Sequence, residues 1–207
     1  SSGSATIKAV PDLVVVYFNI QTTGTNSSDA SDKNSKIYDE MKDSLIDLGF
    51  NENDIQTESL SVYPDYDWQS GTQRIKGYIA THSVKIEILF DNKDKIGETI
   101  DAGINAGAGI SYINYELTEE NQNKYKVEAL AKATEDARTK AEAIAWGAGQ
   151  SIARKPVSIS TSDFSYVPWM AFAQSDVAKS SGAEIETKIT PSEQEISASV
   201  TAVFRIK

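Results

Sequence analysis

The sequence contains no cysteine, and His82 is its single histidine among 207 residues. Without cysteine the chain can form no disulfide, no thiolate nucleophile and no cysteine-ligated metal site. A zinc site of the common nitrogen and sulfur type is also excluded, because one histidine cannot complete it. We therefore predict no metal and no cofactor. The lack of cysteine does not decide the cellular compartment, since a chain of this length can bury a core without covalent cross-links.

Positive charge is scarce as well. Lysine and arginine together number 20 against 30 aspartates and glutamates, which gives a formal net charge of −10. A surface with this charge repels the phosphates of nucleic acids and of anionic membranes, so we expect neither as a partner. Long apolar runs are missing too, because residues 13–18, the longest, fall far short of the roughly 20 residues that span a bilayer. We predict no transmembrane segment.

The chain also lacks a recognisable signal peptide and opens Ser1-Ser2-Gly3-Ser4. Such a start is typical of an expression-tag remnant, so we interpret residues 1–4 as foreign to the natural protein. On this interpretation a natural leader or membrane tether has been removed. The missing leader is then no evidence for a cytoplasmic location.

The longest stretch with a single period is residues 124–149, which predict a helix of about six or seven turns. Glu128 and Asp136 each stand four residues before a lysine, the favourable order for ion pairs on an exposed helix face. Alanine is the commonest residue on the opposite face and would let the helix lie close to a sheet. That face is expected to comprise Val127, Leu130, Ala131, Thr134, Ala137, Ala141, Ile144 and Ala148.

Shorter patterns place the other elements. Strict alternation or runs of β-branched and aromatic residues indicate strands, and apolar residues at helical spacing that stop at a glycine indicate helices. Residues 64–72 are expected to form a turn and residues 162–184 an irregular segment. The strands are predicted at residues 13–23, 54–63, 74–90, 110–117, 155–161 and 195–206, and the further helices at 30–48 and 92–106.

This order predicts an α+β fold with a ferredoxin-like β-α-β-β-α-β core, extended by the long alanine-rich helix and two further strands. We interpret residues 5–207 as a single domain. Its split βαβ portion occupies residues 5–118, and the long helix plus terminal strands occupy residues 119–207. The pattern leaves open whether the last two strands join the first sheet or form their own.

Few residues are candidates for chemistry, and none is predicted to be catalytic. His82 falls in the apolar register of a strand, so we expect a hydrogen-bonded core or edge residue rather than a general base. Asp65 and Asp67 flank Tyr66 and could bind calcium or act as an acid and a base. A solvated hairpin loop is the favoured interpretation of this pair, because turns attract aspartate.

Aromatic residues gather in two places, at the predicted hairpin and in the predicted irregular segment. Exposed aromatic side chains in loops mark contact surfaces, whereas the alternative is that they fold back over the domain's own core. Exposed rings would suit a subunit contact or a stacking platform for a sugar or peptide. The candidate contact surface consists of Tyr63, Tyr66, Trp68, Tyr166, Trp169 and Phe172.

Several short motifs occur in a characteristic order. They are Asp54-Ile55-Gln56-Thr57, Leu60-Ser61-Val62-Tyr63-Pro64, Gly77-Tyr78, Glu128-Ala129-Leu130-Ala131, and Ile189 and Pro191 before the last strand. In this order and spacing they resemble the SIMPL-domain family, long described as a domain of unknown function. The resemblance extends from about residue 10 to residue 204.

The resemblance implies an extracytoplasmic protein, exported or membrane-tethered, that forms ring-like homo-oligomers. Some members of the family are associated with resistance to oxidative stress, and the family offers no established catalytic residues to carry over. Our hypothesis is therefore a non-enzymatic, self-associating module of the cell envelope, with stress protection as a further implication. The alternatives are a domain that binds a small molecule, sugar or peptide through its aromatic loops and, more distantly, an acid–base hydrolase centred on Asp65 and Asp67.

Overall fold

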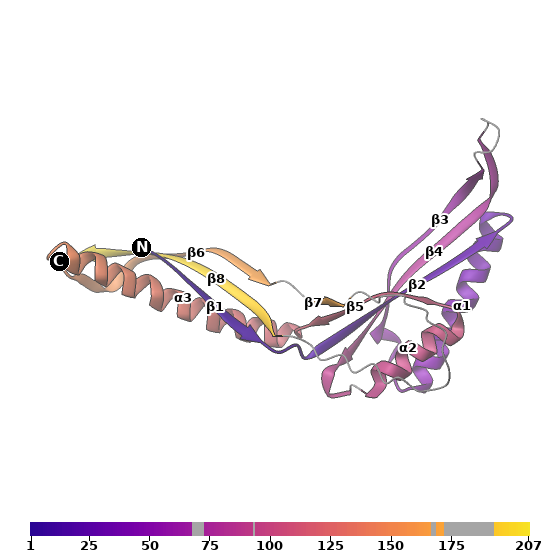
Figure 1. Ribbon diagram of the computed structural model, residues 1–207, viewed down its shortest axis with the longest axis horizontal. Coiled ribbons are helices and arrows are strands. Elements are labelled where there is room, and N and C mark those ends of the chain that lie inside the picture. The colour runs from indigo at the N-terminus through magenta and orange to yellow at the C-terminus, as the bar shows by residue number, and fades with distance from the viewer. Residues whose placement is uncertain (68–72, 93, 167–168, 172–192) are drawn as a thin grey trace, which may run out of the picture. The chain divides into compact units, whose positions relative to one another are not determined.

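The computed structural model describes residues 1–67, 73–92, 94–166, 169–171 and 193–207, and it divides into two compact units. Unit 1 comprises Ser1–Pro11, Leu117–Trp169 and Lys188–Lys207, and unit 2 comprises Asp12–Glu116 and Met170–Thr187. Unit 1 combines the helix α3, and unit 2 the helices α1 and α2, with antiparallel strands (Figure 1). The α+β class predicted from the sequence is confirmed.

Unit 2 is organised around β2 (Leu13–Gly24), which lies inside a sheet of order β3-β4-β2-β5-β7. The neighbours of β2 are β4 (Arg74–Leu89) and β5 (Gly109–Glu116), and both are antiparallel to it. The edges are β3 (Ile55–Asp67) and β7 (Trp169–Ala171). β2 has this inner position because it is apolar on both faces: the three consecutive valines at positions 14–16 are at most 1% exposed.

Helix α1 (Ser27–Asp47) packs on this sheet and has clear signals at both ends. Oδ1 of Asn26 accepts a hydrogen bond from the amide of Asp29 at 2.9 Å, which caps the helix start. The helix ends before Gly49, whose φ of 85° is a conformation that suits glycine. The predicted helix at residues 30–48 is therefore confirmed within a few residues.

Helix α2 (Asp94–Ala106) lies beside α1, and both contribute to the core on the same face of the sheet. Short 3-10 helices, Glu52–Asp54 and Phe90–Asn92, lead into β3 and towards α2. The core consists of large side chains from both layers, among them Phe18, Ile20, Met41, Leu45, Val84 and Ile86.

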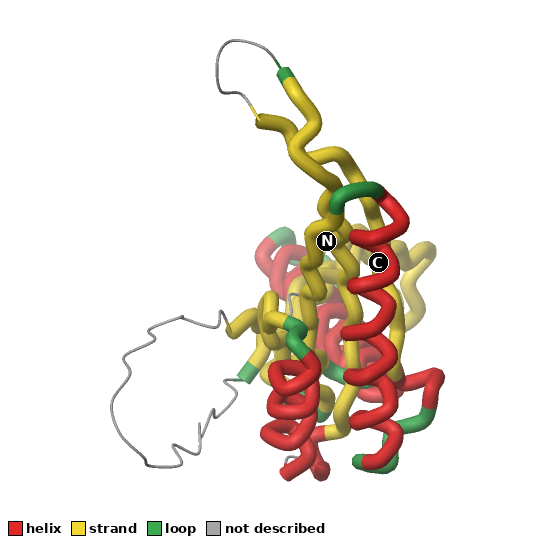
Figure 2. Tube along the Cα trace, turned by 90° about the vertical axis from the view of Figure 1, so that its right-hand side faces the viewer, coloured by secondary structure: helices red, strands yellow, loops and turns green. Residues whose placement is uncertain are grey.

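Unit 1 packs one long helix on a separate three-stranded sheet of order β1-β8-β6 (Figure 2). The strands are β1 (Ser2–Ala9), β8 (Gln194–Ile206) and β6 (Ile152–Tyr166), and the helix is α3 (Glu119–Gly147). The sequence left open whether the last two predicted strands join the first sheet or form their own, and the structure answers this question. The last two long strands pair with each other and with β1, not with the sheet of unit 2.

Strand β1 is missing from the predicted elements, because its partner lies at the other end of the chain. Ser2 pairs with Thr201, and Ala9 pairs with Gln194. Residues 1–4, interpreted above as a tag remnant, take part in this strand, and the amino group of Ser1 donates to the carbonyl of Ala202 at 2.9 Å. Their origin stays a prediction.

The predicted buried face of α3 is right at Ala137 and Ala141 but wrong at most of its other residues. The buried residues follow one another at steps of four and are Ala129, Ala133, Ala137, Ala141 and Ala145. By contrast, Val127 and Ile144, which were expected to face the sheet, are each 68% exposed. The cause is the close approach of the helix to β1, where a Cβ added to Gly3 would overlap the backbone of Ala133 and Ala137. Only the smallest side chains fit there. A prediction that puts the large apolar residues of α3 on its buried face therefore misplaces that face.

The predicted ion pairs of α3 are confirmed. Lys132 lies 2.8 Å from Glu128, and Lys140 lies 2.6 Å from Asp136. The carboxylate of Asp136 also accepts a hydrogen bond from the amide of Ser4 at 2.9 Å, which ties β1 to the helix. Both contacts hold the pKa of Asp136 below its usual value, the lysine contact more strongly.

Two predicted loops are wrong in part. Residues 64–67 belong to β3 instead of a turn, and residues 162–166 continue β6 instead of starting an irregular segment. Backbone pairing across the sheet extends both strands past the point where their alternation fades. The description of the β2-α1-β3-β4-α2-β5 portion as ferredoxin-like stays a prediction. Within the described residues, no helix combines the length and apolarity that crossing a membrane requires.

Candidate functional site

The most exposed apolar feature of unit 2 is the far half of the β3–β4 hairpin, residues 60–67 and 74–79, which we call the hairpin arm. The pairing of β2 with β4 ends at Gly24 and Tyr78, so the last residues of the arm have only each other as strand neighbours. Figure 1 shows the arm extending past the end of β2. A two-stranded ribbon of this kind is marginal alone in water and gains from a partner.

Large apolar side chains of the arm are open to solvent. Tyr63 is 44% exposed and Tyr66 39%. Three aliphatic residues accompany them, Leu60 at 54%, Val62 at 38% and Ile75 at 56% exposure. Apolar groups gathered on a projecting element mark a contact surface.

The structure brings together only two of the six aromatic residues predicted to form a contact surface. Tyr63 and Tyr66 lie on the arm, whereas Trp68 and Phe172 lie outside the described residues and the backbone of Trp169 belongs to β7. The role of the set as a contact surface stays a prediction.

Tyr166, the sixth of these aromatic residues, lies in unit 1. Its hydroxyl accepts a hydrogen bond from the amide of Leu117 at 2.8 Å, and its ring packs against the core of that unit. For this residue the alternative applies, namely that the ring covers the protein's own core.

Asp65 and Asp67 lie on the arm rather than in a loop. They pair across the hairpin with Gly77 and Arg74 respectively. The carboxylate of Asp65 is 3.9 Å from Nζ of Lys76, so a cation already accompanies it. This arrangement gives no particular support to an acid–base pair.

A cavity of about 290 Å³ lies at the base of the arm, beside the end of β2. Its lining comes from the end of β2, the start of α1 and the arm: Thr23, Gly24, Thr25, Lys33, Asp65, Lys76, Gly77 and Tyr78. A Cβ on Gly77 would come within 2.7 Å of the carbonyl oxygen of Gly24, so glycine permits the close passage of these two strands. This requirement explains the Gly77-Tyr78 motif noted in the sequence.

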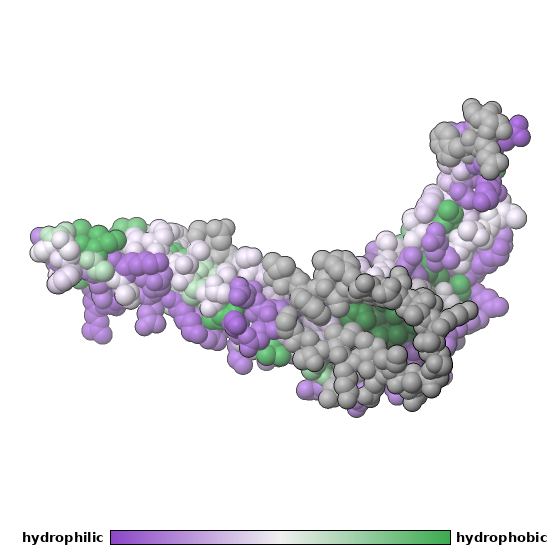
Figure 3. Space-filling model, viewed as in Figure 1, coloured by the Kyte–Doolittle hydropathy of each residue, from purple (hydrophilic) through white to green (hydrophobic). Residues whose placement is uncertain are grey.

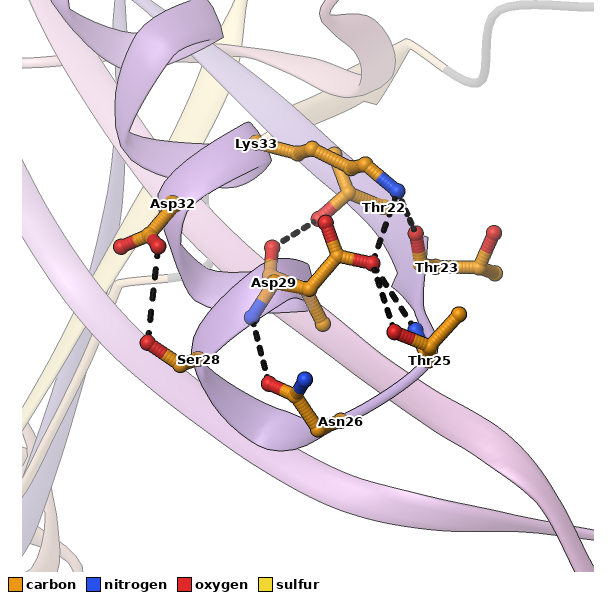
Figure 4. Close-up of polar contacts among 9 residues, drawn as sticks. Thr22, Thr23, Thr25, Asn26, Ser28, Asp29, Asp32 and Lys33 are labelled. Atoms are coloured by element: carbon orange, nitrogen blue, oxygen red, sulfur yellow. Dashed lines mark hydrogen bonds and ion pairs between the residues drawn. The ribbon is translucent and has the colours of Figure 1, made fainter.

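Thr25 and Lys33, at the start of α1, contribute to the lining of this cavity. Figure 4 shows the polar contacts around them. The carboxylate of Asp29 accepts hydrogen bonds from the amide of Thr25 at 2.9 Å and from Nζ of Lys33 at 3.1 Å. The first of these contacts, helped by the second, holds the pKa of Asp29 below its usual value. Asp29 thus supplies the negative charge that a helix N-terminus attracts. The four-residue spacing of Asp29 and Lys33 was the signal available in the sequence.

A second cavity, of about 130 Å³, lies in unit 1 at the end of α3. Ser1, Ala141, Ile144, Ala145, Ile152, Phe204 and Ile206 line it. Ile144 at 68% and Ile206 at 59% exposure both belong to this lining, and we call this end of the unit, with the exposed Trp146 (83%) of the last turn of α3, the helix-end patch. Figure 3 shows apolar atoms gathered at this end of the unit, near both termini. Of the predicted aromatic residues whose side chains the structure describes, Tyr63, Tyr66 and Tyr166, none lines either of these two cavities.

His82 is a buried core residue, as predicted, and is 5% exposed. Its Nε2 lies 2.8 Å from the hydroxyl of Thr57, and its ring lies 4.7 Å from that of Tyr38, centroid to centroid. Burial lowers the pKa of the imidazole. The neutral form is therefore favoured in the folded protein.

Comparison with known proteins places these features in a family context. The chain is 26% identical over 150 residues to an uncharacterized protein, YggE, of Edwardsiella ictaluri, and 27% identical over 150 residues to YggE of Escherichia coli K12. These alignments cover 72% and 71% of this chain but only 62% and 58% of the two relatives. The chain thus spans about six-tenths of their length.

A third relative aligns over the whole chain. The 26 kDa periplasmic immunogenic protein of Brucella melitensis is 23% identical over 216 residues, covering 100% of this chain and 83% of its own length. None of these names states an enzymatic activity. The model of the SIMPL family, described as a protein of unknown function (DUF541), matches residues 1–204. The chain belongs to the SIMPL family.

Proposed function

We propose that this protein is a non-enzymatic, self-associating module of the cell envelope that works outside the cytoplasm. The observation that carries the proposal is the hairpin arm, which presents exposed large apolar side chains along the edge strand β3 and, at Tyr66 and Ile75, beyond the end of β2. The occupant of this surface is a second copy of the chain.

The arm has enough exposed apolar surface to contribute to a stable contact. Complete burial of a large apolar side chain is worth about 1.5–3 kcal/mol, and roughly half of that is available at each arm residue. Tyr63 and Tyr66 add rings with a polar end, a combination enriched in protein interfaces. A contact across several arm residues would therefore outweigh the cost of ordering them.

The helix-end patch offers a second contact surface in unit 1. Ile144 and Ile206, which are 68% and 59% exposed, line a small apolar cavity there, and Trp146, 83% exposed, lies in the last turn of the same helix. Tryptophan is a frequent anchor in protein interfaces, and small apolar cavities receive such anchors. A contact between two different surfaces is head-to-tail and closes into a ring when the rotation permits, which agrees with the ring-like assemblies implied by the family resemblance.

The proposed location outside the cytoplasm is supported by the relative whose name describes it as periplasmic. The link to stress protection rests on the family resemblance alone.

Size-exclusion chromatography with light scattering tests self-association directly. We expect the wild type to be larger than a monomer and the arm variant Leu60→Ser with Ile75→Ser to shift towards the monomer. The matched control is Val127→Ser with Leu89→Ser, which removes comparably exposed apolar groups outside the arm. A wild type that stays monomeric at every accessible concentration would refute self-association, and equal losses in both variants would refute the role of the arm.

A further inference from the structure

The negative charge of this protein is unevenly distributed between its two units. Unit 1 contains 11 lysines and arginines against 9 aspartates and glutamates, whereas unit 2 contains 9 against 21. Unit 2 therefore accounts for the whole of the net negative charge. The expectation that anionic membranes repel this protein rests on the net charge of the complete chain, and it does not hold for every surface of unit 1.

Within unit 1, positive side chains gather at the end of the sheet where β6 begins and β8 finishes. Residues 143–162 and 196–207 contain no aspartate and no glutamate. Their cations are Arg154, Lys155, Arg205 and Lys207. The carboxylate that precedes this stretch, Glu142 of α3, already pairs with Arg138 at 2.8 Å. The local charge is therefore positive in an otherwise acidic protein.

The strand register brings these cations together. Ile152 of β6 faces Ile206 of β8, and Pro156 faces Phe204. Between these two pairs β6 has residues 153–155, whereas β8 has Arg205 alone, because the register shifts there. Arg154 and Lys155 consequently lie opposite Arg205 across the two strands, and all three residues are exposed.

These three cations lack a neutralising neighbour. Within the described residues, none of them takes part in an ion pair. Like charges that face each other across paired strands are destabilising. An anionic surface placed against this end of the sheet would remove the repulsion.

Exposed aliphatic side chains accompany the cations. Val157 is 64% exposed, Ile159 51% and Val203 49%. Val203 faces Ser158, which lies between the other two on β6, the edge strand of this sheet. We call Arg154, Lys155, Val157, Ile159, Val203 and Arg205 the basic strand end.

This combination fits a lipid surface better than other anionic partners. Surfaces that bind anionic membranes place basic side chains at the lipid phosphates and aliphatic side chains in the boundary between headgroups and acyl chains. A nucleic acid offers phosphates but no such boundary, and protein interfaces are depleted of lysine. At physiological ionic strength charges act over about 8 Å, so the charge of this local surface decides the contact.

We propose that the basic strand end docks unit 1 on the surface of a bilayer that contains anionic phospholipids. Arg154, Lys155 and Arg205 pair with lipid phosphates, and the three aliphatic side chains enter the headgroup boundary. The basic strand end shares no residue with the hairpin arm or the helix-end patch. Docking therefore does not depend on the proposed self-association.

Co-sedimentation of the intact chain with lipid vesicles tests the proposal. We expect binding to vesicles of equal parts phosphatidylglycerol and phosphatidylcholine, and this binding should weaken as salt is added. Binding to vesicles of phosphatidylcholine alone should be weaker by about tenfold or more. Failure to bind the mixed vesicles, or equal binding to both kinds, would overturn the proposal.

Charge variants separate this surface from general attraction to cations. Arg154→Gln with Lys155→Gln and Arg205→Gln should weaken binding to the mixed vesicles by about tenfold or more. The control combines Lys36→Gln, Arg74→Gln and Lys124→Gln, which remove the same charge from exposed positions elsewhere and should leave affinity within about twofold. Equal weakening by both triple variants would refute the site.

Two further measurements test the apolar contribution and the identity of the partner. Val157→Ser with Ile159→Ser should weaken vesicle binding by about threefold or more, whereas Val127→Ser with Leu89→Ser should not. Light scattering should find the Arg154, Lys155 and Arg205 variant unchanged in size. A smaller particle with undiminished vesicle binding would identify a second copy of the chain as the partner and overturn the proposal.

Discussion

Helix α1 meets its sheet in unit 2 through Met41 and Leu45, whereas helix α3 meets its sheet in unit 1 through a row of alanines. The first contact fills volume with long side chains, and the second brings the backbones close together. The difference teaches that a core can be apolar for two physical reasons. Large side chains gain from burial in proportion to their area, whereas alanine contributes little area and mainly permits close approach.

The largest effect is expected in unit 2, from Phe18→Ala. Phe18 is fully buried, and its ring lies directly against Gly103 of α2, where there is no room for a Cβ. The substitution leaves a cavity and should lower the free energy of unfolding by about 3–5 kcal/mol. Chemical denaturation measures this loss, and a change below 1 kcal/mol would show that the core collapses to fill the space.

Ala137→Leu tests the opposite kind of core in unit 1. Ala137 lies against Gly3, so a larger side chain must push β1 away from the helix. We expect a loss of about 1–3 kcal/mol from overpacking. Ala143→Leu, at an exposed position of the same helix, is the control and should be nearly neutral. Equal melting temperatures for the two variants would contradict close packing of the alanine row.

The helix caps extend the comparison to a smaller effect. Asn26 accepts the amide of Asp29 at 2.9 Å at the start of α1, whereas Thr118 accepts the amide of Asn121 at 3.4 Å at the start of α3. Asn26→Ala should therefore cost about 1 kcal/mol, and Thr118→Ala less. Thermal unfolding of the two variants compares the costs, and a larger loss for Thr118→Ala would reverse the expected order.

The smallest effect is expected from the titration of His82, the chain's single histidine, which lies in unit 2. Burial lowers the pKa of His82 in the folded state, so the unfolded state binds the proton more readily. Stability should be constant above about pH 6.5 and should fall as pH drops from there through the lower folded-state pKa. Hydrogen exchange should detect the loss in unit 2, and His82→Gln should abolish its pH dependence. The same fall in the variant would assign the effect to another group.

Local pattern was sufficient wherever neighbouring residues decide the structure. The apolar run of β2, the cap at Asn26 and the stop at Gly49 placed the start of unit 2 within a few residues. Alternation also predicted the burial of His82, because its neighbours at steps of two are apolar. On the candidate site, the sequence identified Tyr63 and Tyr66 as aromatic residues near a hairpin tip and placed Tyr63 at the end of a strand, but it did not predict that the strand continues through Tyr66.

Local sequence pattern could not predict the stacked pair Tyr17 and Tyr112. Tyr17 and Tyr112 belong to β2 and β5, which are separated in sequence by α1, β3, β4 and α2, and only the register of the sheet places them side by side. Long-range pairing of this kind leaves no period in the sequence.

By itself, the sequence determined the α+β class, most helix and strand positions, the ion pairs of α3 and the absence of disulfides. Tertiary structure decided which face of α3 is buried, that β1 pairs with β8 across 199 residues of sequence, and that the hairpin arm stays exposed. The reason is that local preferences come from neighbours along the chain. Which helix face is buried and which distant strands pair depend on which backbones can approach closely. In unit 1 the close approach of Gly3 to the backbone of Ala133 and Ala137 determines that the alanine face of α3 is buried.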